Sequence, residues 1–293
     1  MAIRVALHHY TQYDYDQSVF LSPHLVRLRP AAHCQALIEL YALTIQPANH
    51  VVRWQQDPFG NFIARVDFEG PTQQMAIDVS IVARLEPVNP FNFLVDTYAE
   101  SFPFSYESQL RQDLSPYLIT ETPGPLLTHW LRQLDLTQQN TIDFLIKLNQ
   151  RVRQDIAYTV RLQPGVQTPD ETLEKAIGSC RDSGWLVVQI LRQLGLASRF
   201  VSGYLAQVAT LNTNANEPSA QSSDSLALHA WAEVYIPGAG WIGLDPTSGM
   251  LTTEGHIPLA CTTFPTSAAP ITGMTSPSSS TLTYTNTLTQ LPI

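Results

Sequence analysis

The chain has 293 residues, 44% of them hydrophobic, and a formal net charge of −9. This length and composition supply enough apolar surface for one large or two ordinary domains, and they exclude a wholly disordered chain. The acidic balance disfavours nucleic acid and anionic membranes as main partners, because both are bound through clustered basic residues. A neutral or cationic substrate fits this charge better.

The beginning of the chain and its cysteines predict a compartment. Met1–Val5 alternates apolar and polar side chains and lacks the apolar segment of a secretory signal. No stretch approaches the roughly 18 apolar residues that a membrane-spanning helix requires. Cys34, Cys180 and Cys261 form an odd, widely spaced set, which suits a reducing compartment better than a disulfide framework. We therefore predict a cytoplasmic protein; the pattern does not indicate its oligomeric state.

Residues 1–118 carry the pattern of an all-β domain. Short β-branched and aromatic runs alternate with turn-forming stretches such as 56–61 and 69–71. The runs predicted as strands are Val19–Leu28, Ala36–Ile45, Asn61–Phe68 and Met75–Leu85. Prolines and aromatic residues between Pro90 and Pro125 predict an irregular connection, and we place the domain boundary near 118.

Residues 119–293 predict a second, mixed domain with a Ser/Thr-rich tail. Helical spacing covers 126–134, 141–158, 171–177 and 181–194, and Gly195 supplies a stop for the last helix. Strands are predicted over 198–205, 228–235 and 241–246, with one late strand over 281–289. Small polar residues over 208–227 predict a surface loop. The predicted fold class is therefore α+β, with an all-β domain followed by a mixed domain.

Cys180 is the candidate nucleophile because it stands at the start of a predicted helix. Unpaired backbone N–H groups and the positive end of the helix dipole favour a thiolate there. Ser179 followed by Asp182 resembles a capping box, which would hold the helix start in place. The alternative is a buried, inert cysteine, the commoner state of free cysteines in proteins.

The candidate base and its orienting group lie on a predicted hairpin around the turn signal 236–240. Direct pairing of His229 with Asp245 centres the turn on Pro237 and brings the two Cβ atoms to about 5 Å. The same register collects one apolar face, namely Ala230, Ala232, Val234, Ile242 and Leu244. A slip of one residue would move Asp245 onto that face, so the hydrophobic pattern selects the same pairing parity.

Taken singly, His229 fits a structural histidine and Asp245 a turn former before Pro246. With a cysteine at a helix start, they supply the nucleophile, base and orienting acceptor of thiol acyl transfer. Trp231 and Trp241 share the face of His229, and Arg181 adjoins the cysteine, so these three are candidate substrate-binding residues. Six other histidines lack the spacing of metal ligands and are interpreted as structural: His8, His9, His24, His33, His50 and His129.

Four blocks of sequence, in this order, resemble the bacterial transglutaminase-like superfamily: Gly178–Trp185, Arg199–Tyr204, His229–Val234 and Gly240–Thr247. Residues 9–30 resemble the β domain that precedes the core in many of these proteins. The resemblance implies a papain-like core in which the cysteine helix packs on an antiparallel sheet that carries the histidine and the aspartate. Residues 254–261 lack the Arg-Asp-Tyr run of other branches, which implies a different substrate choice. Animal relatives use calcium, but no EF-hand loop occurs here, so we predict no metal and no cofactor.

The predicted function is cysteine-dependent acyl transfer through a Cys180 thioester. The predicted partner is a peptide or isopeptide amide substrate, with no nucleic acid or membrane partner. Attack by water would make the enzyme a peptidase or amidase, and attack by an amine would make it a transglutaminase. Two alternatives stay open: a non-catalytic binding or scaffold module of the same fold, and a metal-dependent hydrolase with cysteine and histidine ligands.

Overall fold

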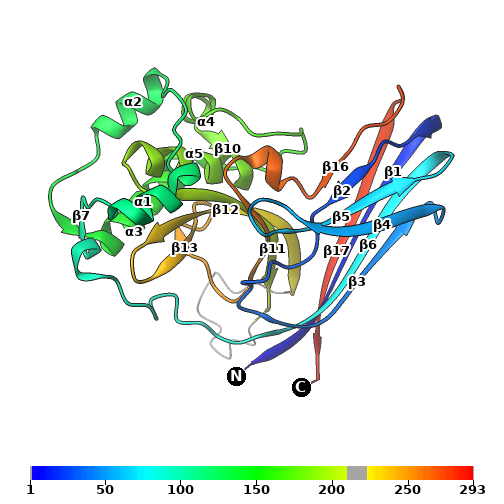
Figure 1. Cartoon of the computed structure of the whole chain (residues 1–293), viewed down its shortest axis with the longest axis horizontal. Helices are drawn as coiled ribbons and strands as arrows, with labels where there is room; N and C mark the ends of the chain where they lie inside the picture. Colours follow the sequence, from blue (N-terminus) through cyan, green and yellow to red (C-terminus); the bar gives the residue numbers. More distant parts are fainter. Residues whose placement is uncertain (1, 210–222, 293) are drawn as a thin grey trace.

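The computed structural model describes residues 2–209 and 223–292. Two stacked sheets built mainly from the N-terminal region form one end of the molecule, and a third sheet with five α-helices forms the rest of the described structure (Figure 1). Among the described residues, no helix is long and apolar enough to span a membrane.

The N-terminal sandwich consists of two four-stranded sheets with the orders β17-β1-β6-β3 and β16-β2-β5-β4. Its strands are β1 (Ile3–Phe20), β2 (His24–Val26), β3 (Leu37–Gln46), β4 (His50–Gln56), β5 (Phe62–Phe68), β6 (Pro71–Leu85), β16 (Ile271–Thr272) and β17 (Ser280–Leu291). Alternate residues of β6 from Met75 to Leu85 are buried between the sheets, as the period of a half-buried strand requires. β1 and β4 were not among the predicted strands, and the predicted run Val19–Leu28 is divided between β1 and β2.

The C-terminal tail returns to this sandwich. β17 pairs antiparallel with β1 from Arg4↔Leu291 to Tyr15↔Ser280, and β16 pairs with β2. The late strand predicted over 281–289 is therefore present, and it pairs with a strand of the sandwich, although the sequence analysis placed the tail with the second domain. The pairing covers the long outer edge of β1, whose backbone groups would otherwise lack partners.

The second part of the chain contains α1 (Ser108–Asp113), α2 (Pro125–Arg132), α3 (Thr141–Asp155), α4 (Pro169–Lys175) and α5 (Cys180–Gln193). Its antiparallel sheet, in the order β14-β13-β12-β11-β15, contains β11 (Ser198–Gln207), β12 (Ser225–Ile236), β13 (Gly240–Asp245), β14 (Met250–Leu251) and β15 (His256–Thr262). Two-residue ladders join β7 (Ser101–Phe102) to β8 (Gln139–Asn140) and β9 (Ala157–Tyr158) to β10 (Ile177–Gly178). Short 3-10 helices occupy Thr97–Ala99, Ser115–Tyr117 and Pro265–Ala268. The region 90–125, predicted as irregular, thus contains α1.

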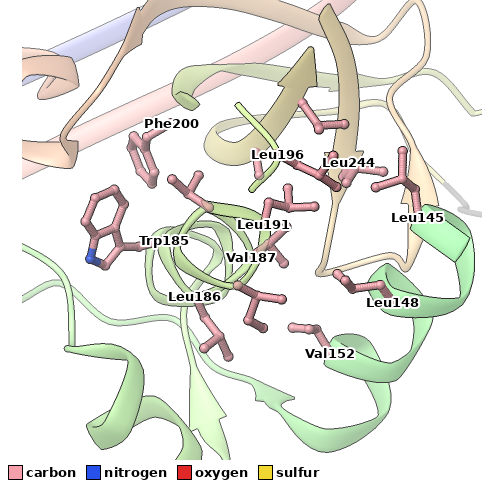
Figure 2. Packing of buried hydrophobic residues seen from close by; sticks show 14 of the residues in the cluster. Leu145, Leu148, Val152, Trp185, Leu186, Val187, Leu191, Leu196, Phe200 and Leu244 are labelled. Atoms are coloured by element: carbon pink, nitrogen blue, oxygen red, sulfur yellow. The ribbon is translucent and has the colours of Figure 1, made fainter. Parts of the chain in front are cut away.

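α5 is the central element of this part. Leu186, Val187 and Ile190 are completely buried, and Figure 2 shows side chains of α3 (Leu145, Leu148 and Val152) on the opposite side of α5 from Phe200 of β11. The sequence predicted one buried face of this helix. In the structure α5 is covered on several sides, so more of its surface is buried than predicted. Burial of each such side chain contributes about 2 kcal/mol, which fixes the helix whose first residue is Cys180.

The hairpin β12–β13 has the predicted parity but a different register. Ala232 pairs with Leu244 and Val234 with Ile242, so the turn centres on position 238 rather than on Pro237. His229 therefore does not lie directly opposite Asp245. The turn contains Gly238 and Gly240 with positive φ angles of 84° and 78°, a conformation that glycine adopts without strain. The predicted apolar face does lie in the core that surrounds α5.

The predicted loop over 208–227 lies largely outside the described residues, since it includes 210–222. Its last residues, Ser225–Ala227, belong to β12. This strand therefore begins earlier than predicted and leads without interruption to His229.

Candidate active site

Cys180 is the first residue of α5, and its side chain is nearly buried. Asp182 Oδ2 accepts hydrogen bonds from the backbone N–H and the hydroxyl of Ser179, at 2.9 and 2.7 Å. The capping box predicted from the sequence is thus confirmed. It fixes the backbone on both sides of the thiol, at the helix end that favours a negative charge.

Asp182 also anchors the segment that precedes α4. Arg161 donates to both carboxylate oxygens, at 3.0 and 2.7 Å, and Gln167 N–H donates at 2.7 Å. Burial would raise the pKa of Asp182, but these hydrogen bonds and those from Ser179 lower it to about 2. The carboxylate is therefore ionised at neutral pH, and it holds residues 161–167 against the start of the cysteine helix.

Arg181 strengthens the same attachment. Its guanidinium donates to the carbonyl oxygens of Arg161 and Gln163, at 2.6 and 3.0 Å. These bonds hold the Arg181 side chain against the backbone of the neighbouring segment. The substrate-binding role predicted for Arg181 therefore has no support in its contacts.

His229 and Asp245 meet although they are not direct cross-strand partners. His229 Nε2 lies 3.2 Å from Asp245 Oδ2, and both side chains are buried. The Cys180 side chain lies close enough to this ring to raise its pKa as well. Burial lowers the pKa of His229, but hydrogen bonding to Asp245 and Cys180, together with their negative charges, raises it to about 9.

Asp245 is held by several donors. The backbone N–H and hydroxyl of Thr247 donate to Oδ1, at 2.9 and 2.7 Å, while His229 and His256 approach Oδ2. Burial opposes the charge, but these hydrogen bonds bring the pKa of Asp245 well below its usual range. Asn149 of α3 donates to the carbonyl oxygens of Asp245 and Met250, at 3.2 and 3.0 Å. The carboxylate is thus ionised and fixed in position.

His256 is a residue of this site that the sequence analysis missed. Its Nε2 lies 3.4 Å from Asp245 Oδ2, and its Nδ1 accepts a hydrogen bond from Thr253 N–H at 3.1 Å. Because Nδ1 is an acceptor, Nε2 carries the proton that points at the carboxylate. The only sequence signal is a histidine at the start of an apolar run. Its position depends on the pairing of β15 with β11, which the sequence does not reveal.

The two tryptophans predicted to bind substrate have other positions. Trp231 is 1% exposed and packs edge-on to His256, with the ring centroids 5.3 Å apart. It passes so close to Gly203 that a Cβ atom there would lie 2.5 Å from the Trp231 ring. Trp241 pairs with Tyr235, six residues along β12 from His229, which corresponds to about 20 Å. Trp231 therefore supports the site from the protein interior, and Trp241 is remote from it.

Apolar side chains are exposed beside the nucleophile. Burial raises the pKa of Tyr158, and the negative charges of Cys180 and Asp245 raise it further. Thr159 N–H donates to Gly178 carbonyl at 2.9 Å, so this segment runs beside the residues that lead into α5. We call four exposed residues here the apolar strip: Tyr158, Val160, Leu162 and Ile177.

Two clusters of the described residues have ligand atoms within 4.8 Å of one another, as a metal site requires: His229, Asp245 and His256, and His33, Glu233 and Cys261. In the second cluster, Arg199 lies 2.6 Å from the Glu233 carboxylate and 3.3 Å from His33 Nε2. This fixed positive charge opposes a bound cation. The first cluster has the chemistry of a zinc site, but its atoms already form the hydrogen bonds described above.

Fold and site together define a protein with a helix-borne cysteine, a buried His–Asp pair and a separate β sandwich. Residues 5–84 match the bacterial transglutaminase-like N-terminal region, and residues 128–246 match the transglutaminase-like superfamily. The resemblance seen in the sequence is confirmed by these two matches, which follow each other along the chain in the predicted order. The second match contains all three candidate catalytic residues, Cys180, His229 and Asp245.

Individual proteins resemble the chain over most of its length. An uncharacterised protein of Mycobacterium tuberculosis is 25% identical over 265 residues, which cover 87% of this chain and 82% of that protein. One of Mycobacterium leprae is 23% identical over 284 residues, with 92% of each chain covered. A solved structure from Cytophaga hutchinsonii, described as a candidate cysteine protease, has a TM-score of 0.71 and 16% identity and covers 100% of this chain and 92% of its own. The last match shows that the fold is shared.

Proposed function

We propose that this protein is a cysteine-dependent acyl-transfer enzyme that attacks an amide bond with Cys180. One observation carries the proposal: the buried ring of His229 lies 3.2 Å from the Asp245 carboxylate, and the nearby Cys180 side chain helps to raise the pKa of this ring. A nucleophile, a base and a group that orients the base are the minimum that thiol acyl transfer requires. The cysteine helix packed on the antiparallel sheet supports a papain-like core.

In the first half of the proposed reaction, the Cys180 thiolate attacks the amide carbonyl carbon and a C–S bond forms. The backbone N–H of Cys180, in the first turn of α5, stabilises the oxyanion of the tetrahedral intermediate. The imidazolium of His229 then gives its proton to the leaving nitrogen, the C–N bond breaks, and a thioester remains. Asp245 stays ionised throughout and keeps the ring in place.

In the second half, His229 changes role from acid to base. The thiolate raises the pKa of this ring, so forming the thioester removes one of the causes that keep it protonated. A less basic, neutral imidazole can then accept a proton from water or from an amine as either one attacks the thioester carbonyl. Breaking the C–S bond returns Cys180 and releases an acid or a new amide.

The apolar strip favours a substrate with an apolar side chain beside the scissile amide. Val160 and Leu162 are 70% and 69% exposed, although water-facing side chains of this kind are normally scattered singly. Arg161, between them in the chain, is tied to Asp182, so the strip is a fixed surface. The similarity to the Cytophaga hutchinsonii structure supports hydrolysis of a peptide or isopeptide amide over protein crosslinking.

Trapping the acyl-enzyme tests this proposal. The protein is incubated with peptides from a cell extract, quenched in acid and measured by intact mass spectrometry, followed by mapping of the modified thiol. An adduct on Cys180, absent from Cys180→Ala and from Cys34 and Cys261, is the expected result. Amide turnover that survives in Cys180→Ala would overturn the assignment.

The cluster of His229, Asp245 and His256 favours one second candidate, a zinc-dependent hydrolase. Elemental analysis of the purified protein separates the two functions. One equivalent of zinc, together with activity that resists iodoacetamide and is lost to a chelator, would favour the metal. Loss of activity upon alkylation of Cys180, with no effect of the chelator, would favour the thiol. A non-catalytic scaffold would show no turnover and no enhanced alkylation of Cys180 below about pH 8.5.

A further inference from the structure

A cavity lies in the N-terminal sandwich, and none of its lining residues belongs to the site around Cys180. Its volume is about 870 Å³, within the range of sites that bind small ligands and peptides. It opens between β3 and β4, the edge strands of the two sheets on the same side of the sandwich. Figure 1 shows these two strands beside each other.

The sandwich is open there because the inner faces of β3 and β4 do not close over each other. Trp54 pairs with buried Ala64 of β5 and so belongs to the inward face of β4, yet it is 43% exposed. A bulge at Glu39 disturbs the pairing of β3 with β6. On either side of it, Leu37 and Leu40 are exposed. The opening therefore has apolar walls and an apolar rim.

Arg29 supplies a positive charge to this cavity. Its guanidinium carbon lies 4.5, 5.2 and 5.6 Å from the ring centroids of Phe62, Trp54 and Tyr41. No hydrogen bond or ion pair of Arg29 occurs within residues 2–209 and 223–292. Stacking on aromatic rings orients the cation without neutralising it.

The cavity contains no free carboxylate for Arg29. Glu39 is the single acidic residue of the lining, and it is paired with Arg4 at 2.7 Å and with Arg84 at 3.0 Å. The chain as a whole has a net charge of −9, so an unpaired cation in an apolar cavity is a local reversal of charge. This pattern is complementary to an anionic group on an otherwise apolar ligand.

Tyr41 adds an unused hydrogen-bond donor. Its hydroxyl is buried and has no hydrogen-bond partner among the described residues. Burial raises the pKa of Tyr41, so the hydroxyl keeps its proton at neutral pH. A buried polar group without a partner is unfavourable, and a carboxylate at this point would accept from both the hydroxyl and the guanidinium of Arg29.

We propose that this cavity binds an extended peptide segment that presents a carboxylate beside apolar side chains, with the carboxylate on Arg29 and Tyr41. Two further features favour a peptide. β3 and β4 each have one edge without a strand partner in the described sheets, and an extended peptide can add to such an edge. The cavity is also larger than a single side chain requires, and its apolar rim continues beyond Arg29.

The experiment uses the full chain with Cys180→Ala, so that binding is measured without turnover. The probes are acetyl-Ala-Leu-Ala-Leu with a free C-terminal carboxylate and the same peptide with a C-terminal amide, titrated by calorimetry and by tryptophan fluorescence. The free acid is expected to bind at least about tenfold more tightly than the amide, since a charged hydrogen bond is lost in the amide. The protein lacks the Cys180 nucleophile in both titrations, so this result is independent of the proposed catalytic function.

Three variants locate the binding. Arg29→Gln and Tyr41→Phe should each weaken binding of the acid toward that of the amide, and Tyr41→Phe removes only one oxygen. Arg53→Gln is the matched control, because Arg53 lies on β4, points outward and is paired with Asp67. Its affinity for the acid should not change. Equal affinities for acid and amide, or no binding of either peptide up to about 1 mM, would overturn the proposal.

Discussion

Replacing His229 by Gln tests the electrostatics of the candidate site through the stability of the fold. The pKa of His229 is raised from 6.5 to about 9 in the folded chain. The folded state therefore binds this proton more tightly than the unfolded state does. The resulting stabilisation is fully present below about pH 6.5 and is lost as the pH rises through about 9. A shift of this size corresponds to about 3 kcal/mol.

The measurement is urea unfolding of the wild-type chain and of His229→Gln at about pH 6 and about pH 9.5. At each pH, the free energy of unfolding of the variant is subtracted from that of the wild type. This difference should be about 3 kcal/mol larger at the lower pH than at the higher pH. Groups other than the site titrate in both proteins and largely cancel in this comparison. Asp245→Asn should remove most of the same pH dependence, because Asp245 is the main partner that raises this pKa. A difference that does not change with pH would refute the electrostatic account.

Three further results are expected. His256→Phe, which keeps a ring but removes the donor to Asp245, should lower amide turnover about tenfold, measured as kcat with Cys180 alkylation as a second readout. Asp182→Asn should lower the free energy of unfolding by about 3 kcal/mol because Arg161 loses its buried partner. Its control is Glu171→Gln, which affects the exposed capping box of α4, and it should cost less than about 1 kcal/mol. Leu162→Ser should raise KM for substrates with an apolar acyl side chain and leave kcat unchanged; an unchanged KM would remove the apolar strip from substrate binding.

Features that depend on neighbouring residues were predictable from the sequence. The capping box of Ser179 and Asp182 is confirmed because its two partners lie three residues apart, and the helix start follows from that spacing alone. The pairing parity of the hairpin is also confirmed. The alternating apolar residues of β12 and β13 can lie on only one of the two faces of the sheet, and they lie on the face toward the core. Both predictions use contacts within about 20 residues of the chain.

Features that depend on distant pairing could not be predicted. His256 reaches Asp245 because β15 lies beside β11, and no periodicity in either strand selects that neighbour. The pairing of the tail could not be predicted for the same reason, since the sequence indicates a strand at β17 but its partner β1 is more than 260 residues away. The hairpin register was missed by two positions, because parity does not distinguish registers that differ by two.

The sandwich contributes to the site through β15. Asn61, a buried residue just before β5, accepts a hydrogen bond from the backbone N–H of Cys261 and donates to its carbonyl, at 2.8 and 3.0 Å. Ala31 N–H donates to the carbonyl of Pro258 at 2.8 Å. These bonds hold β15 from the side opposite to the helices, and β15 begins with His256. Asp245 is therefore supported by two structural units: α3, through the bond from Asn149 to the Asp245 backbone carbonyl, and the sandwich, through β15 and the contact of His256 with the Asp245 carboxylate. A buried Asp with a strongly lowered pKa needs several fixed donors, and the N-terminal region supplies part of that support from outside the transglutaminase-like core.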